Sequence, residues 1–139
     1  MTYEPAQPRY TLTLAGKSYD LIATFGMIDA CEAALNRSII SIASGVFDLP
    51  ARDMAKLICA MIGANGQKLS HQDAGFALMD MGIGSSDYAA FCLEVYAFLS
   101  IALAKPEARE GIREKMGKLK GKVSEPSRGT ITNDSATAL

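Results

Sequence analysis

The strongest constraint on the fold is an alternation of apolar and polar side chains on both sides of Ala15-Gly16, near the start of the chain. A period of two is typical of a β-strand with one buried face, and a short glycine-containing segment between two such runs predicts a hairpin. With these two residues as the loop, Leu12 faces Tyr19. Tyr10 faces Leu21 in the same register, so that one side of the ribbon is apolar. Because an isolated hairpin is at best marginally stable, we expect this side to pack on helices.

About five helices are expected after the hairpin, because apolar residues recur at intervals of three and four between capping residues and glycines. The expected starts are Thr24, Ser38, residues 48–50, Ser70, and Ser85 or Ser86 for a helix over 87–104. The third helix has the clearest inner face, formed by Met54, Leu57, Ile58, Met61 and Ile62. The predicted fold class is mainly α, with an N-terminal β-hairpin packed on the helical bundle and a charged, flexible C-terminal tail.

The chain is long enough for one domain with a modest core. Residues 1–8 are expected to form a flexible leader, and residues 9–104 the hairpin and helical domain. Lys105-Pro106 ends or kinks the last long helix. Residues 105–139 are then expected to hold a charged, solvated helix and, from Gly121 onward, a disordered tail.

The formal net charge is −1, but it is unevenly distributed. Residues 1–104 carry a net charge of −4 and residues 105–139 a net charge of +3. Three cysteines lie far apart in apolar patterns, which argues against a disulfide framework and for a reducing compartment. No export signal is recognisable at the N-terminus, and the most apolar stretch, 89–104, is shorter than the ~20 residues of a membrane span. We expect a cytoplasmic protein that does not enter a membrane.

No constellation of catalytic or metal-binding residues emerges. His71 is the only histidine, and its position in the first turn of a helix is typical of a solvated residue rather than the base of a Cys–His pair. The dispersed cysteines offer no ligand spacing for a metal. The run 82–87 resembles a phosphate loop only superficially, because it follows a helix and contains no lysine. We expect no enzymatic activity and no cofactor.

The segments 70–81 and 86–104 could be arranged as a helix–turn–helix, joined by a glycine turn. A recognition helix needs Arg, Lys, Asn or Gln to reach bases and phosphates, and residues 85–104 contain none of these. Nucleic acid is therefore not an expected partner. The 87–104 helix is apolar almost all round, so it is either the central core helix or partly an interface.

The hairpin and the residues after it resemble a phage tail assembly chaperone, of the branch found in gene transfer agents and related prophages. The matching residues are Leu12-x-Leu14-x-Gly16-x-x-Tyr19-x-Leu21, Thr24-Phe25-Gly26, a short acidic helix with Glu32 and Leu35, and Asn36-Arg37-Ser38. The resemblance covers residues 9–104. It implies a small, mainly helical, non-enzymatic protein that binds the aggregation-prone tape-measure protein in the bacterial host cell. It further implies recruitment of tail tube protein and absence from the finished particle.

Some members of this group are labelled tail tube proteins, but one predicted hairpin is too little sheet for a ring subunit. The alternative function is a structural component of a phage-like particle, either a minor tail or a head–tail protein. Masking an apolar helical chain needs an apolar face, for which the 87–104 helix is the first candidate. The partner-binding residues expected there are Phe91, Glu94, Phe98 and Ile101. The exposed edge of the hairpin is the second candidate surface, and self-association stays open.

Overall fold

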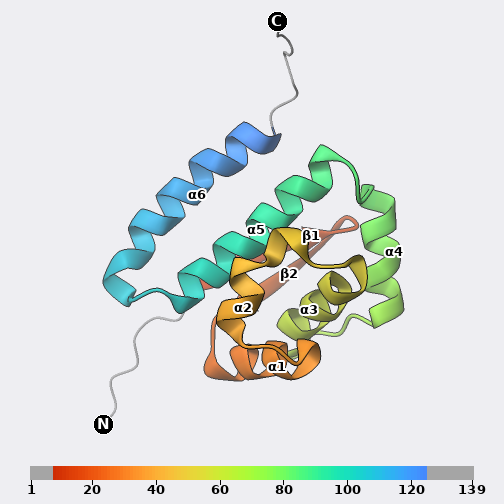
Figure 1. The fold of residues 1–139 in the computed structure, drawn as a ribbon, viewed down its shortest axis with the longest axis horizontal. Coiled ribbons are helices and arrows are strands. Elements are labelled where there is room, and N and C mark those ends of the chain that lie inside the picture. Colours follow the sequence, from red (N-terminus) through yellow and green to blue (C-terminus); the bar gives the residue numbers. More distant parts are fainter. Residues whose placement is uncertain (1–7, 125–139) are drawn as a thin grey trace, which may run out of the picture.

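The computed structural model describes residues 8–124 of the chain and confirms a mainly helical fold with an N-terminal hairpin (Figure 1). The remaining residues, most of the expected leader and the end of the expected tail, lie outside the described residues. The elements are β1 (Arg9–Leu14), β2 (Lys17–Ile22), α1 (Phe25–Leu35), α2 (Ile39–Ser44), the 3₁₀ turn η1 (Val46–Asp48), α3 (Ala51–Gly63), α4 (His71–Met81), α5 (Ser86–Leu103), the 3₁₀ turn η2 (Pro106–Ala108) and α6 (Arg109–Ser124).

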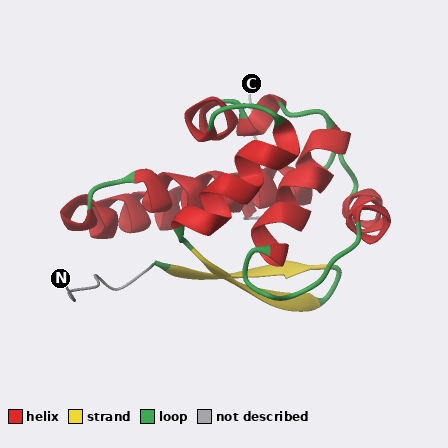
Figure 2. Ribbon diagram, turned by 90° about the horizontal axis from the view of Figure 1, so that it is seen from below, coloured by secondary structure: helices red, strands yellow, loops and turns green. Residues whose placement is uncertain are grey.

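The hairpin has the predicted register. Leu12 is opposite Tyr19 and Tyr10 is opposite Leu21 in an antiparallel pair. The loop residues Ala15 and Gly16 both have positive φ, 54° and 79°, which is the conformation of a type I′ turn. Figure 2 shows the two strands as a separate layer along one side of the helices. The helices therefore cover the apolar side of the ribbon, as the alternation of apolar and polar residues predicted.

Four of the expected helix starts are confirmed by side-chain caps. The hydroxyls of Thr24, Ser38, Ser70 and Ser85 each accept a hydrogen bond from the backbone N–H three residues later. This arrangement satisfies one of the free N–H groups in the first turn of each helix. Capping residues therefore decide where these helices begin.

The core lies between the hairpin, α3 and α5. All five residues of the predicted inner face of α3 are fully buried. From the hairpin side, Leu12, Leu14 and Leu21 are buried as well. The core side of α5 adds Phe91, Cys92, Val95, Phe98 and Leu99. Helix α5 is thus the central core helix, one of the two alternatives that its composition left open.

The C-terminal segment differs from the expectation in two ways. Helix α6 continues to Ser124, so residues 121–124 are helical rather than part of a disordered tail. The helix also packs along α5 instead of standing alone in solvent (Figure 1). The physical reason is that α5 has a second apolar side, which needs a cover.

Candidate functional site

The partner surface expected on α5 is not on the surface. The exposed fraction is 4% for Phe91, 1% for Phe98 and 3% for Ile101. Glu94, the fourth expected residue, is half-buried. Other elements of the chain already occupy this region, so an apolar helix here indicates internal packing. The expectation that these residues form a free docking face is wrong.

Glu94 has a specific role inside the fold. The Tyr10 hydroxyl donates a hydrogen bond to the Glu94 side chain, and the Tyr10 ring centroid lies 6.0 Å from that of Phe98. Burial first, and then the charge and the hydrogen bond of Glu94, raise the pKa of Tyr10 above its ordinary value. The hydroxyl therefore stays protonated and joins β1 to α5.

The second expected surface, the edge of the hairpin, is partly occupied by the loop between α3 and α4. The backbone N–H of Asp20 donates to the Gln67 side-chain oxygen at 3.1 Å. The Asn65 side-chain amide donates to the Asp20 carbonyl. Both bonds use main-chain groups on the outer edge of β2, where an added strand would otherwise pair. This part of the edge is closed to a partner.

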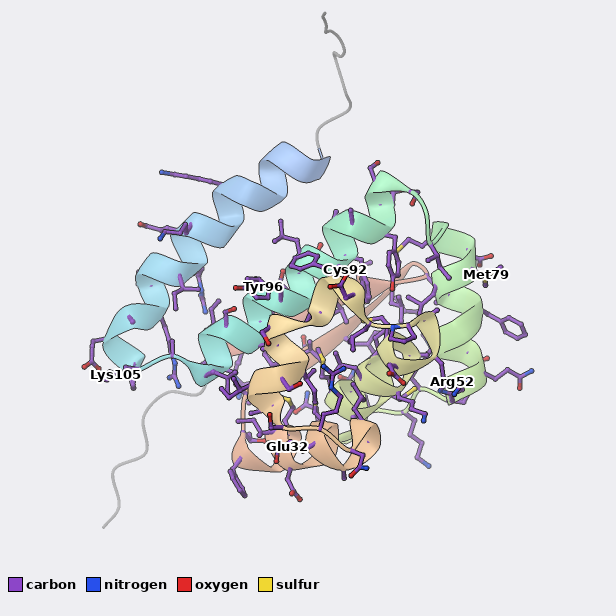
Figure 3. All side chains as sticks on the ribbon, viewed as in Figure 1. Glu32, Arg52, Met79, Cys92, Tyr96 and Lys105 are labelled. Carbon is purple, nitrogen blue, oxygen red and sulfur yellow. The ribbon has the colours of Figure 1, made fainter. Side chains whose placement is uncertain are left out.

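The accessible apolar surface lies elsewhere, beside α4. Met79 is 69% exposed and Phe76 60% exposed, and Ile83, just after the helix, is 39% exposed. They line a groove of about 320 Å³ between α3 and α4, which we call the Met79 groove. Figure 3 shows Met79 and Arg52 on the side of the molecule formed by these two helices. The groove is lined by Ala51, Arg52, Ala55, His71, Gln72, Gly75, Phe76, Leu78, Met79 and Ile83.

A second hollow continues from this groove. We call it the Phe47 recess, after a residue of η1 that is 55% exposed. Its lining is Phe47, Asp48, Leu49, Ala51, Ile83, Gly84, Ser85, Tyr88, Ala89 and Cys92. Ala51 and Ile83 line both hollows, so the two form one continuous surface from α4 to the start of α5. The Phe47 ring also packs on Tyr96, with centroids 5.5 Å apart, which holds the rim of the recess.

Helix α4 creates the groove because it carries two apolar stripes. Ala74, Ala77 and Leu78 face the core and are buried. Phe76 and Met79 lie three residues apart on a different side of the helix, and Ile83, which follows the end of α4, extends the apolar surface that they form. The sequence-based expectations did not include this surface. The three-residue spacing of Phe76 and Met79 within the predicted helix was the available signal.

Polar side chains also line this surface. Arg52 and His71 line the Met79 groove, and both are exposed. Asp48 lines the Phe47 recess and is also exposed. A combination of apolar and polar side chains is the usual composition of a protein-binding surface.

The cysteine thiols are held in their protonated form. Burial, and next the charge of Glu32, raise the pKa of Cys31 to about 12. Burial also raises the pKa of Cys59 and of Cys92. A protonated thiol is a poor nucleophile and a poor metal ligand. Within residues 8–124, no group of three or more His, Cys, Asp or Glu side chains is placed to hold a metal ion.

Among the described residues, α5 is the one helix whose length and composition would allow it to cross a membrane. The core helix of a folded domain has the same properties, and much of α5 is buried here.

Comparison with protein-family models, with curated proteins and with solved structures found no match to this chain. The candidate functional site is the surface formed by the Met79 groove and the Phe47 recess.

Proposed function

We propose that this chain is a tail assembly chaperone of the gene-transfer-agent type, which binds a tape-measure protein and assists tail tube assembly without catalysing a reaction. The resemblance of residues 9–104 to that family suggests the role. The observation that supports it is the continuous apolar surface of the Met79 groove and the Phe47 recess, which is accessible in the folded chain.

A tape-measure protein is a long, helical, apolar chain that aggregates when it is left bare. Such a client is recognised by a groove that accepts the apolar side of an amphipathic helix, with anchors three, four and seven residues apart. Methionine suits this task because its unbranched side chain adapts to different neighbours. Met79, Phe76 and Phe47 place flexible and aromatic side chains along one such path.

The expected affinity is moderate. Complete burial of a Phe or Met side chain is worth about 1.5–3 kcal/mol, and the exposed side chains of this surface are already partly covered. Each anchor then contributes on the order of 1 kcal/mol before the loss of side-chain freedom is counted. Binding of this strength allows release, which an assembly chaperone requires before the tail is complete.

The test is co-expression with the tape-measure protein of the same gene cluster, followed by a solubility assay and size-exclusion chromatography. We expect the client to be soluble and to co-elute only when this chain is present. Met79→Asp should abolish both effects, because it places a charge in the groove. Ile40→Asp is the matched control, because Ile40 is 64% exposed on α2, outside both hollows.

Two results would contradict the proposal. The first is a client that stays insoluble and never associates with the wild-type chain. The second is an equal loss of binding in the Met79 and Ile40 variants, which would separate binding from the groove. Detection of the chain in purified particles would favour the alternative, a structural tail or head–tail component.

A further inference from the structure

Among the methionines whose side chains the structure describes, one is exposed. Met79, on α4, has 69% of its surface exposed. Met27, Met54 and Met61 are at most 1% exposed and belong to the core, and Met81 is half-buried against it. Figure 3 shows Met79 at the outer side of α4. A reagent that attacks thioether sulfur therefore reaches Met79 first in the folded chain.

The cysteine thiols compete poorly for such a reagent. Cys31 and Cys92 are buried, and Cys59 is half-buried. Burial raises the pKa of all three thiols, that of Cys31 to about 12. A peroxide oxidises the thiolate rather than the thiol, and a thiol with a raised pKa forms little thiolate at neutral pH. Among the described side chains, the sulfur of Met79 is thus the most accessible target.

The reaction at Met79 requires no loss of a proton, because a thioether carries no titrating hydrogen. A sulfur lone pair attacks one oxygen of hydrogen peroxide, and the O–O bond breaks. The second oxygen leaves as water, with both hydrogens of the peroxide. Sulfur loses two electrons and the peroxide gains them. The product is methionine sulfoxide, in which a polar S–O group replaces an apolar sulfur.

This change takes place inside the Met79 groove. Phe76 and Ile83 are the other large apolar side chains exposed along it. An apolar side chain of a client that covers Met79 removes water from its sulfur. A sulfoxide oxygen covered in the same way loses its hydrogen bonds to water and finds no donor on an aliphatic partner. The modified groove therefore binds an apolar helix less well than the unmodified groove.

We infer that Met79 is the site at which a peroxide modifies the folded chain, and that the sulfoxide at this position closes the Met79 groove to an apolar helix. The position of the modification does not depend on a partner. Its effect on the client rests on the proposed function, since the client supplies the helix. Methionine sulfoxide reductases restore the thioether, so the modification is reversible.

The fold tolerates oxidation at Met79 better than oxidation in the core. The Met79 side chain lies outside the core cluster, and changes at exposed positions usually alter stability little. A sulfoxide at Met54 or Met61 would instead place a polar group among the buried residues of α3. Because the folded chain shields those two sulfurs, mild oxidation changes the binding surface and leaves the domain intact.

Peptide mapping by mass spectrometry locates the modification. The full chain is treated with hydrogen peroxide at neutral pH, and the reaction is stopped at intervals with excess free methionine. Proteolysis before Asp80 places Met79 and Met81 in different peptides. We expect Met79 to gain one oxygen atom at least about tenfold faster than Met54 and Met61, and also faster than Met81. A rate at Met79 that does not exceed the other three would overturn the inference.

Binding is measured before and after peroxide treatment of each chain, so that a difference in basal affinity between variants does not enter the comparison. The probes are an anilinonaphthalene sulfonate dye, which needs no client, and a fluorescently labelled helical fragment of the tape-measure protein. Treatment of the wild type should lower the affinity for both probes at least about fivefold. Reductase treatment should restore it. Met79→Leu has no sulfur at this position, so its binding should not respond to peroxide.

The matched control carries its exposed methionine outside the groove. In Met79→Leu/Ile40→Met the new thioether lies on α2, at a position that is 64% exposed and lines neither hollow. This chain should be oxidised at its new methionine without a change in binding. An equal loss of binding in this variant would assign the effect to oxidation in general and overturn the inference.

The inference and the proposed function can fail separately. If Met79 is oxidised but binding of neither probe changes, the groove accepts the sulfoxide and the inference is overturned, while client binding still supports the proposed function. If oxidation weakens dye binding but the tape-measure fragment binds no form of the chain, the inference stands for the groove and the proposed function is overturned. A loss of binding in peroxide-treated Met79→Leu would place the sensitive group elsewhere and overturn the inference.

Discussion

The carboxylate of Glu32 in α1 accepts a hydrogen bond from the backbone N–H of Ile39, the first residue of α2, at 2.8 Å. The chain reverses between them at Asn36, whose φ of 55° ends α1 in the left-handed conformation. In α2, the Ser38 hydroxyl accepts a hydrogen bond from the backbone N–H of Ser41. A carboxylate at a helix N-terminus satisfies a free donor and interacts favourably with the helix dipole. Glu32 therefore fixes the angle between α1 and α2.

Replacement of Glu32 should destabilise the whole domain. We expect Glu32→Ala to lower the free energy of unfolding by about 1–2 kcal/mol, because it leaves the part-buried Ile39 N–H without its charged acceptor. Urea unfolding followed by circular dichroism measures this difference. Asp29→Ala, at an exposed position of the same helix, removes the same charge and is the control. An equal effect of the two substitutions would assign the loss to net charge instead of the cap.

The turn of the hairpin offers a stabilising substitution. Ala15 has a φ of 54°, which is unfavourable for alanine and well tolerated by asparagine. Asn-Gly is the preferred pair in a type I′ turn, so Ala15→Asn should raise the free energy of unfolding by about 1 kcal/mol. Thermal unfolding measures the gain. Ala64→Asn is the comparison, because Ala64 has a φ of −64°, and a gain there would contradict the argument from the turn.

The sequence predicts those parts of the fold that are determined by residues close to one another along the chain. The hairpin register follows from alternation around Ala15-Gly16, and the helix starts follow from Thr24, Ser38, Ser70 and Ser85. The contact between Glu32 and Ile39 was not predictable, because it depends on the angle between two helices. The same holds for Asn65 and Gln67, which reach Asp20 across more than forty residues of sequence.

The candidate site was harder to predict for a related reason. Phe91, Phe98 and Ile101 lie on a helix whose composition shows that it is buried, but not which neighbours bury it. Their neighbours include β1, from one end of the chain, and α6, from the other. Conversely, no sequence-based expectation concerned Phe76 and Met79, and their exposure is apparent only in the packed structure.

Stability should fall at alkaline pH through Cys31. Its pKa is about 12 in the folded chain, against 9.0 for an ordinary thiol, owing to burial and then to the charge of Glu32. Above about pH 9 the unfolded chain releases this proton while the folded chain keeps it, so stability is complete below that pH and decreases as the pH rises toward 12. The maximum slope is about 1.4 kcal/mol per pH unit for one thiol.

Urea unfolding of the wild type and of Cys31→Ala, at several values between about pH 8 and pH 10, measures this slope. The variant is expected to be less stable at every pH, because it leaves a cavity, but its stability should depend less steeply on pH. The control is Ile42→Val, which removes volume at a buried position of α2 without removing a titrating group and should leave the pH dependence unchanged. If the free energy of unfolding depends on pH equally steeply in the wild type and in Cys31→Ala, ionisation of this thiol is not linked to folding.

The Met79 groove should bind a small apolar probe where isolated exposed residues do not. The double variant Phe76→Ser/Met79→Ser removes both anchors of one concave surface, whereas Phe25→Ser/Ile40→Ser removes two exposed side chains outside both hollows. Because all four residues are exposed, each substitution should change stability by no more than about 0.5 kcal/mol. We expect fluorescence of an anilinonaphthalene sulfonate dye with the native chain to fall severalfold in the first double variant and to stay unchanged in the second. Equal fluorescence in the two double variants would mean that the groove does not act as one binding surface, and the proposed client site would lose its physical basis.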